Sequence, residues 1–135
     1  MASRYLLDTN TASYIIKGNI PAVRDRLVRV PMEQIAISTI TEGELRYGVA
    51  RRPDATRLQT IIVEFLLRLT ILPWDSGAAQ QYGRLRATLE REGRPMGNLD
   101  MMIGAQALAS DLVLVTNDHA FKRIKKLKIE DWTKP

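Results

Sequence analysis

The sequence predicts an α/β fold in three layers, with a central, mainly parallel β-sheet between two layers of helices. Short apolar runs alternate along the chain with stretches of helical periodicity, which is the pattern of successive β-α-β units. The segment Leu112–Thr116 reads Leu-Val-Leu-Val-Thr, and such a nearly continuous apolar run is typical of a strand buried on both faces of a parallel sheet. A chain of 135 residues suits one domain, so we expect a single domain over residues 1–135.

Short segments rich in apolar and β-branched residues carry the strand signal. The expected strands are Tyr5–Leu7, Gln34–Ser38, Thr70–Leu72, Leu112–Thr116 and an edge strand at Lys128–Ile129. Because helical segments separate them, right-handed crossovers should join these strands in parallel.

The clearest helical segment runs from about Asp54 to Arg68. Its apolar residues recur at the i, i+3, i+4, i+7 spacing of one helix face, namely Leu58, Ile61, Ile62, Phe65, Leu66 and Leu69. A second long helix is expected from Ser76 to Glu92, and Gly93 is well placed to end it. Shorter helices are expected at Thr11–Lys17, Ala22–Arg29, Thr41–Val49 and Asp100–Ser110.

The composition narrows the class of protein. The chain carries 20 Lys and Arg against 15 Asp and Glu, a net charge of +5, which favours polyanionic partners but identifies none. It contains no Cys, which excludes disulfides, thiolate metal sites and Cys nucleophiles. Asp8 interrupts the first apolar run too early for a signal peptide, and no apolar stretch approaches the ~20 residues of a membrane helix. We therefore expect a soluble, cytoplasmic protein without a membrane partner.

Acidic residues stand near the carboxyl ends of the predicted strands, where parallel α/β sheets gather catalytic groups. Asp8 follows the first strand, Glu44 opens the helix after the second, Asp100 opens the helix after the Arg94–Asn98 loop, and Asp118 lies just past the fourth strand. Carboxylates that converge on one edge of a sheet are the ligands that a hard divalent cation requires. The sequence therefore predicts a site for Mg²⁺ or Mn²⁺ formed by these acids.

Each of these acids also has a purely structural interpretation. Glu44 stands three residues after Thr41, the spacing of a capping box, and Asp100 in a first helical turn complements the helix dipole. Asp8 and Asp118 suit turns in which the side chain bonds to nearby backbone. Caps and turns give no reason for all of these acids to gather at one end of a sheet, so their joint placement favours the metal site.

The acids lie within sequence blocks that resemble a known family. The blocks are Tyr5-Leu-Leu-Asp-Thr-Asn10, Ser38-Thr-Ile-Thr-Glu-Gly-Glu-Leu-Arg-Tyr-Gly48, Gly93-Arg-Pro-Met-Gly-Asn-Leu-Asp-Met-Met-Ile-Gly-Ala105, Val115-Thr-Asn-Asp118 and Glu130-Asp-Trp132. In this order they are similar to the signature blocks of the VapC family, the PIN-domain ribonucleases that serve as toxins of type II toxin–antitoxin pairs. The resemblance spans nearly the whole chain.

The resemblance implies a PIN-like fold and a Mg²⁺- or Mn²⁺-dependent endoribonuclease that cuts structured RNA, such as tRNA or rRNA, and so inhibits translation. It makes Asp8, Glu44 and Asp100 the core acids and Asp118 the fourth, with a 5′-phosphate and a 3′-hydroxyl as products. It further implies a cognate VapB-like antitoxin and a homodimer. Asn98 departs from the pattern, since many relatives have Pro at its place.

Polar and basic residues extend the candidate site. Asn10 and Thr116 stand beside acids and are candidates to orient them, although both residue types also suit capping. Arg84 and Arg91 share one helix face, and Arg94 continues it into the following loop, as a track of contacts to RNA phosphates requires.

Three further features leave alternatives open. The basic residues Lys122, Arg123, Lys125, Lys126 and Lys128 have no interleaved aromatic residue, so RNA contact and a solvated face are equally open. Val63 and Leu67 lie outside the apolar stripe of their helix, and a second copy, an antitoxin segment or the protein's own fold could cover them. His119 is the only His, so a two-histidine ribonuclease mechanism is excluded. We expect His119 to lie in an exposed loop.

Two rival functions remain. A phosphoryl-transfer domain also places acids at strand ends, but a haloacid dehalogenase-like phosphatase requires a second Asp where Asn10 stands, and a receiver domain requires an acid pair after the first strand. The other rival is a non-catalytic α/β module that binds RNA or a partner protein. An assay of RNA cleavage with and without Mg²⁺ discriminates between these functions.

Overall fold

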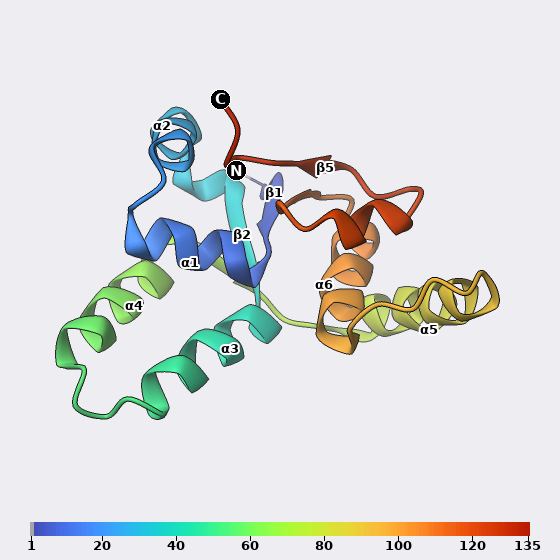
Figure 1. Ribbon diagram of the computed structural model, residues 1–135, viewed down its shortest axis with the longest axis horizontal. Coiled ribbons are helices and arrows are strands. Elements are labelled where there is room, and N and C mark those ends of the chain that lie inside the picture. The colour runs from blue at the N-terminus through green and yellow to red at the C-terminus, as the bar shows by residue number, and fades with distance from the viewer. Residues whose placement is uncertain (1) are drawn as a thin grey trace.

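The computed structural model describes residues 2–135 (Figure 1). Its strands are β1 (Tyr5–Leu7), β2 (Ile35–Ser38), β3 (Thr70–Leu72), β4 (Val113–Val115) and β5 (Ile129–Glu130). Its α-helices are α1 (Thr9–Lys17), α2 (Pro21–Arg29), α3 (Thr39–Ala50), α4 (Thr56–Arg68), α5 (Ser76–Arg91) and α6 (Asn98–Ala109). The short 3₁₀ helices η1 (Met32–Gln34) and η2 (His119–Arg123) complete the elements described.

The strands form one parallel sheet in the order β3-β2-β1-β4-β5, which confirms the predicted α/β class. Leu6 at the centre of β1 pairs with Ala36 of β2 on one side and with Leu114 of β4 on the other. The chain steps outward from β1 to β3 and then returns to β4 on the opposite side of β1. The strand order therefore reverses between β1 and β4, and the carboxyl ends at such a reversal are where α/β sheets place their ligands.

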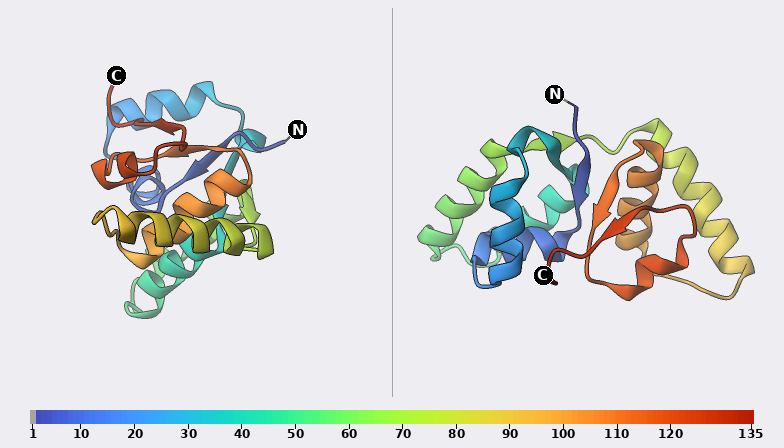
Figure 2. Two further views of the ribbon diagram at one scale, coloured as in Figure 1. Left: turned by 90° about the vertical axis from the view of Figure 1, so that its right-hand side faces the viewer. Right: turned by 90° about the horizontal axis from the view of Figure 1, so that it is seen from above.

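Two hydrophobic cores lie on opposite faces of the sheet, as the predicted three layers require. Tyr5 and Leu7 face one core together with Phe65 of α4, whereas Leu6, between them in sequence, faces the other core with Leu89 of α5. Figure 2 shows α1, α2 and α4, in blue to green, on one side of the central strands, with α5 and α6, in yellow to orange, on the other. No helix within residues 2–135 combines the length and the apolar character needed to cross a bilayer.

The start of α3 corrects one prediction. This helix begins at Thr39 instead of Thr41, because Ser38 is its N-cap and Ser38 Oγ accepts a hydrogen bond from Ile40 N at 3.0 Å. The interpretation of Thr41 and Glu44 as a capping box is therefore wrong. Glu44 does not open the helix but lies in its second turn, where no backbone N–H needs a cap.

Other boundaries differ by one or two residues. Helices α1, α2 and α6 begin earlier than predicted, α4 begins later, at Thr56, and α5 and α6 each end one residue earlier. Gln34 ends η1 instead of opening β2, and the edge strand β5 is shifted by one residue to Ile129–Glu130. Gly93 follows α5 with φ of +66°, a left-handed conformation that suits Gly and confirms the predicted helix end.

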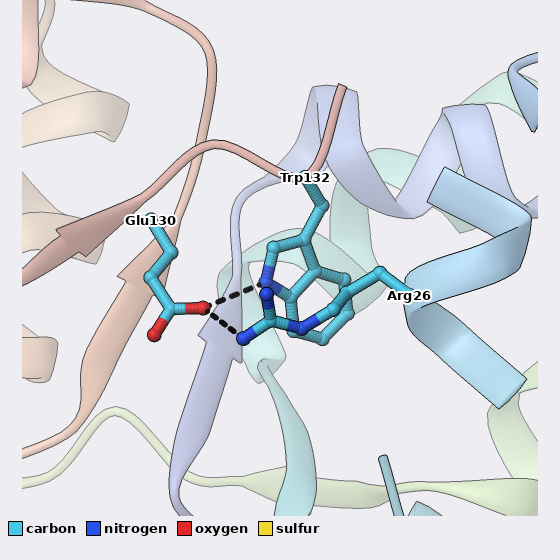
Figure 3. A network of polar contacts seen from close by, with 3 residues as sticks. All are labelled: Arg26, Glu130 and Trp132. Atoms are coloured by element: carbon cyan, nitrogen blue, oxygen red, sulfur yellow. Dashed lines mark hydrogen bonds and ion pairs between the residues drawn. The ribbon is translucent and has the colours of Figure 1, made fainter. Parts of the chain in front are cut away.

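Arg26 of α2 contacts the C-terminal segment (Figure 3). Its Nη2 donates a hydrogen bond to Glu130 Oε1 at 2.7 Å, and Trp132 Nε1 donates to the same oxygen at 3.0 Å. Trp132 is buried and packs edge-on against Tyr5 of β1, with ring centroids 5.3 Å apart. The Glu130-Asp-Trp132 block therefore ties the edge strand and the chain end to α2, which is a structural role.

Gly104 allows α6 to pack closely against the segment that follows β4. A Cβ atom at this position would lie 2.7 Å from Ile124 Cδ1, and Ile124 is buried. Gly83 in α5 is also helical, but a Cβ there meets nothing within 4 Å. We expect Gly83→Ala to stabilise the fold by about 0.4–1 kcal/mol and Gly104→Ala to be less stable than Gly83→Ala by about 1–3 kcal/mol, because overpacking opposes the gain in helix propensity.

Urea unfolding of both variants measures this difference. In the Gly104→Ala background, Ile124→Val removes the Cδ1 atom that causes the clash and should recover part of the loss. Equal stabilities of the two Ala variants would show that α6 has room to spare beside Ile124.

Candidate active site

Asp8 stands at the carboxyl end of the central strand β1, and its carboxylate is held from two sides. Its Oδ1 accepts a hydrogen bond from Thr11 N at 2.8 Å, which caps α1, and its Oδ2 accepts one from Thr116 Oγ1 at 2.5 Å. The residue is only 4% exposed. Burial raises the pKa of Asp8, and the hydrogen bonds from Thr116 and Thr11 oppose this shift. Capping is thus part of its role and fixes the carboxylate in place.

Thr116 links Asp8 to Asp118 across the point where the strand order reverses. The Thr116 hydroxyl donates to Asp8 and accepts a hydrogen bond from Asp118 N at 3.0 Å. Asp118 Oδ1 in turn accepts from Ala120 N at 2.9 Å and caps η2. One buried hydroxyl thus bonds to both segments that carry these acids, and an orienting role for Thr116 stays a prediction.

The carboxylates of Glu44 and Asp100 have no hydrogen-bond or ion-pair partner among the described residues. Both residues are partly exposed. They line a common hollow of about 520 Å³ at the carboxyl edge of the sheet. Its lining residues are Thr9, Asn10, Glu44, Gly97, Asn98, Leu99, Asp100 and Ile103. Two carboxylates without partners at one hollow are available to a bound group.

The acids act on one another electrostatically. Burial is the largest cause that raises the pKa of Asp100, followed by the negative charges of Asp118, Asp8 and Glu44. All the acids predicted from the sequence therefore contribute to one electrostatic field. In the described part of the chain, no three His, Asp or Glu side chains lie close enough together to bind one ion.

As candidate ligands, these acids form an oxygen-rich set without His, which would suit Mg²⁺ or Mn²⁺. Proteins commonly hold Mg²⁺ through one or two carboxylates, with water and substrate phosphates completing the octahedron. Glu44 and Asp100, which line one hollow, are two carboxylates of the kind that such a site would use.

The other predicted residues are placed as follows. Asn10 lines the acidic hollow, is exposed and makes no side-chain hydrogen bond within residues 2–135, so no contact supports an orienting role for it. Arg84, Arg91 and Arg94 are exposed on α5 and the loop after it, and Arg91 Nη2 donates to Thr88 Oγ1 at 3.3 Å. His119 is exposed but begins η2 instead of lying in a loop.

One polar pair was not predicted. Thr9 Oγ1 and Thr41 Oγ1 lie 3.2 Å apart and join the start of α1 to α3, which carries Glu44. The sequence offered Thr41 only as a capping residue, and no local signal relates two hydroxyls that are 32 positions apart. The pair helps to set the distance between the segments that bear Asp8 and Glu44.

Comparisons with known proteins agree with this architecture. The family model described as "PIN domain" matches residues 5–127. The chain is 36% identical to the tRNA(fMet)-specific endonuclease VapC of Shigella flexneri and 38% identical to that of Salmonella typhimurium, and each alignment covers 96% of this chain and 98% of the relative. Among solved structures, DNA-bound VapBC from Salmonella typhimurium is similar, with a TM-score of 0.89, 37% identity, and coverage of 96% of this chain and 98% of that chain.

The family model spans most of the chain, and the similarity to the VapC relatives extends over nearly its full length in sequence and in fold. The chain therefore belongs to the PIN domain family and, within it, to the VapC ribonucleases.

Proposed function

We propose that this protein is the toxin of a type II toxin–antitoxin system and that it cuts structured RNA as a Mg²⁺- or Mn²⁺-dependent endoribonuclease. The observation that carries the proposal is that Glu44 and Asp100 line one hollow at the carboxyl edge of the sheet, where Asp8 and Asp118 also act on Asp100 electrostatically. Such acids favour a cation: burial is the main cause that raises the pKa of Asp100, the neighbouring negative charges raise it further, and a bound positive charge opposes that repulsion.

The acids differ in how firmly the protein holds their carboxylates, and we assign them different roles. Asp8, held by Thr11 and Thr116, supplies a carboxylate of fixed orientation, while Glu44 and Asp100 supply carboxylates that are free to turn toward an ion. When bound, the ion supplies positive charge beside the scissile phosphate and activates water. Water adds to phosphorus and the 3′-oxygen leaves with a proton, which gives a 5′-phosphate and a 3′-hydroxyl without a covalent enzyme intermediate.

We propose structured RNA as the substrate class, with tRNA as the first candidate because both VapC relatives described above are named for tRNA(fMet). Arg84, Arg91 and Arg94 offer exposed positive charge for RNA phosphates along α5 and its following loop. An RNA substrate that takes part in translation also implies action in the cytoplasm.

The direct test is cleavage of bulk tRNA and rRNA by the purified protein with Mg²⁺, with Mn²⁺ and with EDTA. We expect discrete fragments only when metal is present, and ligation-based sequencing should capture them through their 5′-phosphates. Metal-independent cleavage, or intact RNA under all conditions, would contradict the proposed function.

An antitoxin is the partner we propose for the exposed face of α4. Val63 is 51% exposed and Leu67 is 80% exposed, although both are large apolar residues. Val63 also lines a hollow of about 240 Å³ between α3 and α4, with Arg46, Val49, Ala50, Gln59 and Ile62. Two of the similar solved structures are those of VapBC2 from Rickettsia felis and of VapBC from Salmonella typhimurium. A homodimer is the alternative that would cover the same residues.

We expect Leu67→Asp to weaken binding of the cognate antitoxin by about tenfold, equivalent to ~1.4 kcal/mol, because it places a charge in an apolar contact. Ala87→Asp, which adds the same charge on an exposed position of α5, serves as the matched control. Isothermal titration calorimetry gives the affinities, and sedimentation of the isolated protein reports self-association. Wild-type behaviour of Leu67→Asp in both measurements would exclude this face as an interface.

A further inference from the structure

Two groups of basic residues that are separate in sequence meet in the structure. Arg94 belongs to the loop after α5, and Arg123 ends η2 near the C-terminus. Together with Gly93 and Pro95 they line an open hollow of about 450 Å³. The residues that line it include two Arg and no Asp or Glu.

Arg123 is fixed at the hollow by a backbone contact. Its Nη1 donates to Pro95 O at 2.8 Å, which holds the loop after α5 against η2 and leaves its remaining N–H groups free for another acceptor. Arg94 forms no side-chain hydrogen bond or ion pair within residues 2–135. By contrast, two nearby Lys residues form ion pairs: Lys125 Nζ lies 3.8 Å from Glu92 Oε2, and Lys128 Nζ lies 3.1 Å from Asp111 Oδ1. The charge of the two Arg residues is therefore not neutralised by the protein.

Two segments of the chain connect the residues of this hollow to the acidic site. The loop that carries Arg94 continues to Gly97, which lines the acidic hollow beside Asp100. Helix η2 runs from its N-cap Asp118 to Arg123 over five residues. At a rise of about 2.0 Å per residue, this places the backbone of Arg123 ~10 Å from that of Asp118. The basic hollow is thus beside the acids but distinct from them.

We propose that Arg94 and Arg123 form a subsite for an RNA phosphate that neighbours the scissile one. This inference rests on the proposed ribonuclease function and adds a second anchor for its substrate. The planar guanidinium fork matches phosphate oxygens, and the fixed position of Arg123 lowers the cost of ordering it. The lining contains no aromatic side chain on which a base can stack, so the subsite reads the backbone and not the sequence.

The test is the salt dependence of RNA binding, measured by fluorescence anisotropy of labelled single-stranded RNA with the whole protein in EDTA. For single strands, each phosphate contact contributes about 0.7 to the slope of log K against log salt concentration. Because both Arg residues contact the same phosphate in this proposal, we expect Arg94→Gln and Arg123→Gln each to flatten the slope by up to about that amount, with RNAs of unrelated sequence affected equally. Arg94→Gln removes no intramolecular bond, so it tests the charge without disturbing Pro95.

Lys126→Gln is the matched control, because it removes an exposed charge from the same segment without lining the hollow. The proposal predicts a smaller change of slope for Lys126→Gln than for either Arg variant. Equal slopes for the Arg variants and the wild type, or an equal loss with Lys126→Gln, would overturn it. It would also be overturned if the Arg variants bound RNA normally and lost affinity only for antitoxin. Because binding is measured without metal, these outcomes are independent of whether the protein cleaves RNA.

Discussion

Asp100→Asn is expected to lower metal-dependent RNA cleavage by at least about a hundredfold, because it removes a carboxylate that we propose as a metal ligand, and a bound metal supplies several kcal/mol of transition-state stabilisation. Asp100 forms no hydrogen bond within residues 2–135 and is partly exposed, so Asn fits its position without breaking a contact. The loss should therefore appear with an unchanged circular dichroism spectrum.

Initial rates of tRNA cleavage at saturating Mn²⁺ measure this effect. Asp54→Asn removes the same charge from an exposed turn and is the control that should retain full activity. Cleavage by Asp100→Asn at the rate of Asp54→Asn would remove Asp100 from the active site.

Variants of Asp8 and of Thr116, which donates a hydrogen bond to it, extend this test. Asp8→Asn should abolish cleavage as Asp100→Asn does. Its cost in stability should be smaller than the ~1–3 kcal/mol of a lost hydrogen bond to a charged group, because Asn removes a buried charge, whose pKa burial raises, as well as an acceptor for Thr11 or Thr116. Thr116→Val should lower cleavage by about 10–100-fold through loss of orientation, and Thr116→Ser should restore it. An inactive Thr116→Ser variant would point to packing of the methyl group instead.

Metal should stabilise the wild-type fold, and Asp100→Asn should lose most of this response. A ligand that binds only the folded state adds about 2.7 kcal/mol at one hundred times its dissociation constant. For a domain of this size, ~1 kcal/mol corresponds to a shift of about 3–5 °C in melting temperature. A Mn²⁺ concentration one hundred times the dissociation constant should therefore raise the wild-type melting temperature by roughly 10 °C.

Without metal, the order of stabilities should change. The pKa of Asp100 is raised in the folded state, so the folded protein holds this proton more tightly than the unfolded chain does. Stability is thus lost as pH rises from the ordinary Asp value through the raised one, and the ionised Asp100 destabilises the fold at neutral pH. Asp100→Asn removes that charge, and we expect it to melt at or above the wild type in EDTA.

Thermal melts of both proteins with EDTA and with Mn²⁺, at pH 7, provide the four values needed. A wild-type protein without any metal-dependent shift, or an equal shift in Asp100→Asn, would reduce these acids to caps and helix-dipole partners.

The sequence determined the strands of this fold well. Tyr5–Leu7 and Thr70–Leu72 have the predicted bounds, because a short apolar run closed by a polar residue has few alternatives in a buried sheet. Helix starts were less predictable. Ser38 and Thr41 are both residue types that cap helices, and only the backbone conformation selects Ser38.

The sequence also indicated which acids act on one another, since Asp8 and Asp118 follow strands that are parallel neighbours and Asp100 lies in the first turn of α6. Glu44, however, lies in the second turn of α3 and does not open it. Only the tertiary structure decided what each acid contacts. Asp8 meets Thr116 across 108 positions, and Arg123 meets Pro95 across 28. Such contacts depend on strand order and on how closely helices approach, and local propensity carries no information on either. The chain thus encodes its chemistry in residues near strand ends, whereas packing sets the geometry in which that chemistry can occur.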